Sequence, residues 1–365
     1  MSYGEALRAL KPYILMVFLQ FGYAGMYVIS VASLKRGMNH YVLVVYRNGI
    51  AAAVMAPFAF WFERKVRPKM TLSCFLKIML LALLEPVLDQ NFYYAGANYT
   101  NASFSAALYN MLPAVTFVMA IMLRMEKIKI KKLHSQAKVI GTLITVAGAL
   151  VMIMYKGRII EFVWTKGRAH HAAAGSQDGR HWLLGTFMLI VSCCCWSAFF
   201  VVQSNTLRSY PAELSLTTWI CVMGTAQSTA VTLVMARTGN PWAIGFDMRL
   251  LTAAYSGIMC SGIAYYVQGM VIKERGPVFV TAFNPLCMIV VAALGSFILA
   301  EEINLGRVIG AVIIVVGLYM LIWGKSKEYS LEASGKEATL ELPTVKTIDA
   351  DAAEKPAPSA CAEVV

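Results

Sequence analysis

Three ionisable residues stand inside long apolar stretches of the chain, where an unpaired charge is costly: Arg47, Glu85 and Asp89. Glu85 and Asp89 are four residues apart, so on a helix their side chains would share one face. Pro86 lies between them and predicts a kink, because proline removes a backbone hydrogen bond. Such carboxylates could contact an ammonium group or relay a proton. An internal ion pair with Arg47, joining two helices, is the simpler interpretation of a buried carboxylate near an arginine.

Side-chain amides recur in the apolar stretches of both halves, and they are costly in lipid unless they meet each other or a ligand. Asn110 precedes Pro113 and Asn284 directly precedes Pro285, so each asparagine marks a predicted helix break where backbone groups become available. An amino acid needs acceptors for its ammonium group and donors for its carboxylate, and such positions supply both. Hydrogen bonding between helices is the alternative role of these amides, and we expect it for Gln227.

Aromatic residues on the same stretches could line a cavity for apolar or indole side chains, with helix packing as the alternative. The predicted substrate-binding residues are Gln90, Asn91, Tyr93, Asn110, Pro113, Trp196, Gln203, Tyr265, Gln268, Asn284 and Pro285, with Arg47, Glu85 and Asp89 as the proton or ion-pair group. The sequence shows no metal-ligand spacing and no phosphate-binding P-loop, so we expect no metal, no cofactor and no ATP-driven step. We also expect no enzyme activity.

The elements that must position these residues follow from the composition. Of 365 residues, 58% are apolar and 14% charged, and the mean hydropathy is +0.61. Soluble domains carry about 25% charged residues, so a soluble globular fold does not fit. A helix needs about 20 residues to cross the hydrocarbon core of a membrane. The chain therefore predicts an all-α integral membrane protein with ten transmembrane helices, at 12–33, 41–61, 74–96, 103–123, 138–155, 183–204, 214–235, 250–271, 278–299 and 304–323.

The basic residues sit mainly in the short connections between these helices, so the net charge of +12 indicates membrane topology and no nucleic-acid partner. Most of them fall on the side that holds the N-terminus. We therefore expect both termini in the cytoplasm, and the plasma membrane rather than the vacuolar membrane. The expected partners are the lipid bilayer and a small-molecule solute, and a homo-oligomer is compatible with the sequence.

The chain divides into two halves that repeat. Residues 1–155 and 183–323 each hold five predicted helices, a polar outer loop at 156–182 separates them, and we expect the tail at 324–365 to be disordered. The matching segments are Tyr93-Tyr94 with Tyr265-Tyr266, Asn110-x-x-Pro113 with Asn284-Pro285, Lys138-Val139-Ile140-Gly141 with Arg307-Val308-Ile309-Gly310, and Gly148 with Gly317. Five is odd, so the second copy enters the membrane inverted, and inverted repeats place the substrate site near the midplane between the copies. Gly141, Gly148 and Gly306-x-x-x-Gly310 are small residues that permit close helix contact.

These residues carry a family resemblance over roughly residues 10–328. The motifs are Gln90-Asn91-x-Tyr93-Tyr94-x-Gly96, Ala102-x-Phe104, Asn110-x-x-Pro113-Ala114-x-Thr116-Phe117, Arg124-x-Glu126, Trp196-Ser197, Gln203, Tyr210-Pro211-Ala212-x-Leu214-Ser215, Gly276-Pro277-Val278-Phe279, Pro285-Leu286, Glu301 and Trp323-Gly324-Lys325-x-Lys327-Glu328. The chain resembles plant EamA-type members of the drug/metabolite transporter superfamily, in the nodulin-21-like or walls-are-thin-related branch that includes the UMAMIT amino acid transporters. It departs from the family pattern at Tyr109 and at Asn101-Ala102-Ser103.

The resemblance implies two five-helix EamA repeats and secondary transport of small organic solutes, most often amino acids, in both directions or outward. It also implies that the fifth and tenth helices meet, at a dimer-like or an inter-repeat seam. Alternating access at a mid-membrane site fits this expectation. Auxin-like indoles and other metabolites are the alternative solutes. A channel is the alternative class, but a channel needs a continuous polar stripe, whereas the polar residues here gather near the middle of the predicted helices.

Overall fold

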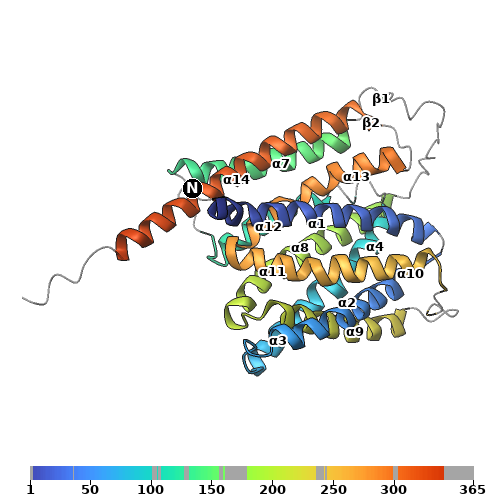
Figure 1. Ribbon diagram of the computed structural model, residues 1–365. Coiled ribbons are helices and arrows are strands. Elements are labelled where there is room, and N and C mark those ends of the chain that lie inside the picture. Colours follow the sequence, from blue (N-terminus) through green and yellow to red (C-terminus); the bar gives the residue numbers. More distant parts are fainter. Residues whose placement is uncertain are drawn as a thin grey trace, which may run out of the picture.

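The apolar stretches of the sequence fold as helices that run side by side in one bundle (Figure 1). The computed structural model describes residues 3–35, 37–100, 105, 108–126, 131–155, 159–160, 179–235, 242, 245–298 and 303–340. Most of the loop at 156–182, the tail beyond residue 340, and Ala102, Phe104 and Glu301 of the family motifs lie outside these ranges. The fold is all-α, as predicted. Two strands of two residues each, β1 (Ile159–Ile160) and β2 (Ile303–Asn304), pair antiparallel.

The helices follow the predicted order in both halves. The first half contains α1 (Tyr3–Lys35), α2 (His40–Phe62), α3 (Leu72–Ala82), the π-helical segment η1 (Leu83–Asp89), α4 (Gln90–Tyr99), α6 (Leu112–Met122) and α7 (Leu133–Met154). The second half contains α8 (Gly179–Ser209), α9 (Glu213–Met235), α10 (Met248–Tyr255), the π-helical segment η2 (Ser256–Ile263), α11 (Ala264–Arg275), α12 (Pro277–Ala282), α13 (Asn284–Ile298) and α14 (Leu305–Leu340).

Six described segments are long and apolar enough to cross a membrane by themselves: parts of α1, α8 and α14, the whole of α2 and α9, and the continuous helix α10–η2–α11. The shorter α6 and the paired α12 and α13 are also apolar. With α7 and the interrupted helix α3–η1–α4, they give the ten crossings that the sequence predicts.

The two halves pack against each other in a symmetrical pattern. The second helices of the halves, α2 and α9, contact each other, and so do the fifth helices, α7 and α14. The first helix of each half packs on the third and fourth helices of the other half: α1 contacts α10, α11 and α13, while α8 contacts α4 and α6. This exchange is what two inverted repeats produce.

One contact between the halves involves a helix terminus. The backbone N–H groups at the start of a helix have no partner within the helix. At the start of α9, Leu214 N and Ser215 N donate to the two carboxylate oxygens of Glu63, at 2.9 and 2.6 Å. Glu63 directly follows α2, so the first half caps a helix of the second.

Both predicted helix breaks are present. In the first half the chain turns at Asn110 and Met111, and α6 then begins at Leu112. In the second half α12 ends at Ala282 and α13 begins at Asn284. Each break follows from a proline in the first turn of the next helix, where its missing N–H costs nothing.

The third helix of each half contains a π-helical segment at its middle. Pro86 lies in η1, so the helix continues with wider turns across the position where the sequence predicts a kink. Aligning Tyr93 with Tyr265 brings η1 and η2 into register and places Ser261 opposite Asp89. π-Helical turns are uncommon and are often found at functional sites.

The fifth and tenth helices meet along a glycine seam, as predicted, and lie together at one edge of the bundle (Figure 1). A Cβ atom on Gly141 would lie 2.6 Å from the backbone N of Leu321, and one on Gly317 would lie 2.6 Å from the backbone N of Thr145. Only glycine permits such an approach.

The tail differs from its predicted boundary, because α14 continues to Leu340, past residue 324 where disorder was expected. The segment after Gly324 is rich in Lys, Glu, Ala and Leu, which favour helix. It extends a helix that already exists, so no new nucleation is needed.

Candidate functional site

The centre of the bundle contains a buried ion pair between the first two predicted charges. Arg47 Nη2 of α2 lies 3.8 Å from Glu85 Oε1 of η1, and both side chains are almost fully buried. The ion pair that the sequence favoured is confirmed. The sequence did not indicate that the pair reaches into the second half: Arg47 Nε donates to Ser261 Oγ at 2.7 Å, and the Tyr265 hydroxyl donates to Glu85.

Asp89 has different partners from Glu85, although both belong to η1. Its carboxylate accepts hydrogen bonds from the Tyr109 hydroxyl at 2.5 Å and from Ser192 Oγ at 2.6 Å. The two carboxylates, whose spacing predicts a shared helix face, therefore have separate sets of hydrogen-bond partners.

Glutamine side chains of three helices contact the ion pair or the tyrosines beside it. Gln203 Nε2 of α8 donates to the Tyr265 backbone oxygen at 3.3 Å, and Gln268 Nε2 of α11 donates to the Tyr23 hydroxyl at 2.8 Å. Gln90 Nε2 donates to both oxygens of Glu85, at 3.1 and 3.2 Å. Within the described structure these amides each leave a buried polar atom without a partner: Oε1 of Gln90, Gln203 and Gln268, and both polar atoms of Gln20 on α1.

Aromatic rings form a continuous wall beside Asp89. The ring centroids of Tyr93 and Tyr109 are 4.7 Å apart, and those of Tyr109 and Trp196 are 5.3 Å apart. Trp196 also meets Tyr23 edge to face at 6.4 Å. The wall thus combines residues of α1, α4 and α8 with Tyr109, which lies just before the break in the fourth helix.

The other predicted binding residues lie at or near the helix breaks. Asn110 and Pro113 are buried around the start of α6, and Pro285 is buried in the first turn of α13 beside the half-buried Asn284. Asn91 Nδ2 donates to the backbone oxygen of Val87, one turn earlier, at 2.7 Å. Gln227, expected to join helices, donates to the Met79 backbone oxygen at 3.2 Å.

Sequence reasoning missed four members of the centre: Tyr23, Tyr109, Ser192 and Ser261. The repeat could have identified Ser261, because the register that aligns the tyrosine pairs puts it opposite Asp89. A single serine in an apolar helix gives no such signal, so Ser192 could be found only from the folded chain.

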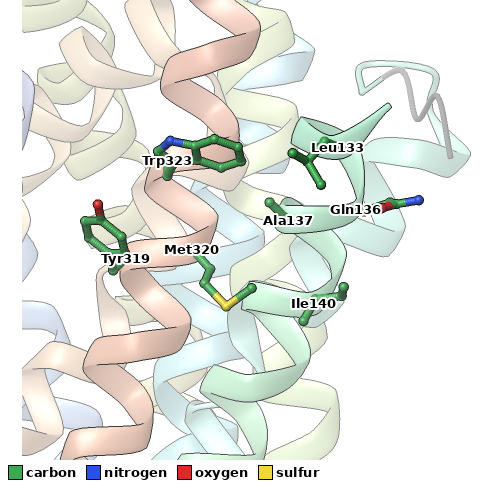
Figure 2. A pocket seen from close by; sticks show the side chains of 7 residues that line it. All are labelled: Leu133, Gln136, Ala137, Ile140, Tyr319, Met320 and Trp323. Carbon is green, nitrogen blue, oxygen red and sulfur yellow. The ribbon is translucent and has the colours of Figure 1, made fainter. Parts of the chain in front are cut away.

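A groove lies on the exposed side of α7 and α14, and Figure 2 shows the side chains that line it. Its lining residues are Leu133, Gln136, Ala137, Ile140, Tyr319, Met320 and Trp323. They include none of the predicted site residues, and most are exposed apolar side chains of the kind that face lipid. The candidate site is therefore the buried centre between the repeats.

Comparison with known proteins agrees with this arrangement of repeats. The model of the "EamA-like transporter family" matches residues 10–154 and 183–323, one segment in each half. The chain belongs to the EamA-like transporter family. Within it, the chain is similar to plant proteins of Arabidopsis thaliana. WAT1-related protein At1g21890 is 55% identical over 333 residues, which cover 88% of this chain and 85% of the relative. WAT1-related protein At4g08290 is 53% identical over 353 residues, covering 95% and 92%.

A solved structure shares the fold. One crystal structure matches with a TM-score of 0.65 at 14% sequence identity, and covers 86% of this chain and 98% of its own. The chain is thus a multi-pass integral membrane protein of a transporter family, of the plant WAT1-related branch, with EamA repeats in both halves.

Proposed function

We propose that the chain is a secondary transporter of amino acids that works by alternating access at the buried centre between its repeats. One observation carries the proposal: residues of both halves meet there, and several buried amide atoms lack partners within the described structure. A buried polar atom without a partner costs about 1–3 kcal/mol. A passing solute with donors and acceptors would satisfy such atoms.

The chemistry of the centre suits an amino acid. The Arg47 guanidinium and the amide N–H groups can donate to a carboxylate, while buried side-chain oxygens of the centre can accept from an ammonium group. The aromatic wall would face the side chain. The proposed substrate-binding residues are those predicted from the sequence: Gln90, Asn91, Tyr93, Asn110, Pro113, Trp196, Gln203, Tyr265, Gln268, Asn284 and Pro285. Flux in both directions or outward fits such a site.

Inverted repeats supply a mechanism for alternating access, because the same interface can open on either side when one repeat rocks against the other. We also propose that both termini are cytoplasmic and that the plasma membrane holds the protein. The distribution of basic residues supports this orientation. The chain acts on solutes without changing them, so it is no enzyme.

An auxin-like indole is the second candidate solute, because the wall of Tyr23, Trp196, Tyr109 and Tyr93 would stack against an indole ring. An indole acid lacks the ammonium group for which the buried oxygen acceptors of the centre are suited.

The experiment that tests the proposal is efflux of labelled amino acids from oocytes that express the chain and have been injected with a mixed pool. We expect release of several amino acids above that from oocytes lacking the chain, lost in Gln268→Ala. Gln136→Ala, which changes an exposed glutamine of the outer groove, should release as the native chain does. No release of amino acids, with the protein at the cell surface, would contradict the proposal and turn attention to indole acids.

A further inference from the structure

The two buried carboxylates of η1 differ in how their charge is balanced. Glu85 has the Arg47 guanidinium at 3.8 Å. No basic side chain of the described residues lies within ion-pair distance of Asp89, whose side chain accepts hydrogen bonds from the neutral hydroxyls of Tyr109 and Ser192. Asp89 is 5% exposed. A carboxylate buried among neutral donors is costly and gains most from a cation.

The surroundings of Asp89 also suit a cation on their apolar side. Tyr109 contacts Tyr93 and Trp196, with ring centroids 4.7 and 5.3 Å away. Aromatic faces attract cations within about 6 Å of the ring centre, and the attraction strengthens away from water. A carboxylate beside several tyrosine and tryptophan rings is a combination that recognises an amine.

The hydroxyl groups can change partners when a cation arrives. Tyr109 and Ser192 both donate to Asp89, and their hydroxyls are also within hydrogen-bond distance of each other. A hydroxyl can donate and accept. Both oxygens can therefore accept from an ammonium group while Asp89 receives its third N–H.

We propose that Asp89, Tyr109 and Ser192 bind the protonated amino group of the transported solute, beside the rings of Tyr93 and Trp196. The proposal rests on the proposed function, since the bound amine is the solute that the chain carries. It assigns different tasks to the two carboxylates: Glu85 holds Arg47, and Asp89 selects solutes with a primary ammonium group over acids that lack one.

The test measures binding to the purified full-length chain as thermal stabilisation by three probes of one carbon skeleton. Leucine carries both charged groups, 3-methylbutylamine the ammonium group alone, and 4-methylpentanoate the carboxylate alone. We expect leucine and the amine to stabilise the native chain more than the acid does. Asp89→Asn should weaken amine binding about tenfold or more, and Ser192→Ala by a smaller factor. Ser228→Ala, at a buried serine of α9, is the matched control and should bind as the native chain does.

Equal stabilisation by the amine and the acid, or an unchanged amine preference in Asp89→Asn, would overturn the proposal. If Asp89→Asn does not fold, the test rests on Ser192→Ala. Unchanged affinity for the amine in that variant overturns the proposed amine site. Retained amine binding in Asp89→Asn together with a flattened pH dependence of transport would assign Asp89 to proton transfer and also overturn it. A native chain that carries no amino acid, yet binds the amine in an Asp89-dependent manner, would refute the proposed function and leave the amine site standing.

Discussion

Replacing Lys138 by methionine should destabilise the fold, because this lysine belongs to a buried cluster of four charges. Lys138 Nζ lies 3.2 Å from Glu126 Oε2 and 2.8 Å from Glu328 Oε2. Lys325 contacts Glu126 and lies 3.6 Å from Glu328. The two lysines balance the two glutamates. The cluster joins the loop after α6 to α7 and α14, and so ties the first half to the second.

The magnitude follows from burial and charge balance. The Lys138 side chain is 1% exposed, so Lys138→Met keeps the apolar stem and removes only the charge. It leaves two carboxylates, Glu126 buried and Glu328 18% exposed, with one base. Removing one partner of a buried ion pair costs about 3–5 kcal/mol. Since the lost base served both glutamates, the expected loss lies in this range.

The assay is thermal unfolding of the purified chain in detergent, with two comparison variants. Lys132→Met removes an exposed lysine just before α7 and should change stability by less than about 0.5 kcal/mol. Lys138→Met combined with Glu328→Gln restores charge balance and should recover a large part of the lost stability. If Lys138→Met unfolds at the same temperature as Lys132→Met, the reasoning from buried charge is refuted.

Two further changes test the centre and the seam. Arg47→Met should lower the free energy of unfolding by about 3–5 kcal/mol, because it leaves Glu85 buried without a base. Adding Glu85→Gln should restore folding but not amino acid flux. Recovery of both folding and flux would show that the ion pair serves only to join helices. Gly141→Ala should lower the thermal stability by about 1–3 kcal/mol, because its methyl group would lie 2.6 Å from a backbone nitrogen of α14. Gly49→Ala, whose nearest neighbour would be a side-chain atom at 3.7 Å, is the control that should leave stability unchanged.

Much of the fold could be predicted from the sequence, because a membrane helix needs a long apolar run and every such run is visible. The broken fourth helices were predictable from Asn110 and Pro113 and from Asn284 and Pro285, since proline ends an α-helix by simple sterics. Gly141 predicted the seam because close helix contact demands small residues. The helical extension of α14 was not predictable from composition, which is equally typical of a disordered tail.

The site could be predicted only in part. Arg47 and Glu85 pair as the sequence suggested, because two opposite charges in apolar helices have few other partners. The partners of Asp89 were not predictable, because Tyr109 and Ser192 lie 20 and 103 residues away in sequence. A lone hydroxyl in an apolar helix gives no pattern that points to its partner.

Counterflow in liposomes that contain the purified chain tests whether the chain works by alternating access to one site. The vesicles are loaded with an unlabelled mixture of amino acids and diluted into a trace of the same mixture with label. We predict that the label accumulates transiently above its equilibrium level, because a carrier exchanges one solute for another. Vesicles that contain the chain but no unlabelled amino acids should show no such overshoot. Label that enters equally with and without unlabelled amino acids inside, or that does not enter at all, would contradict alternating access.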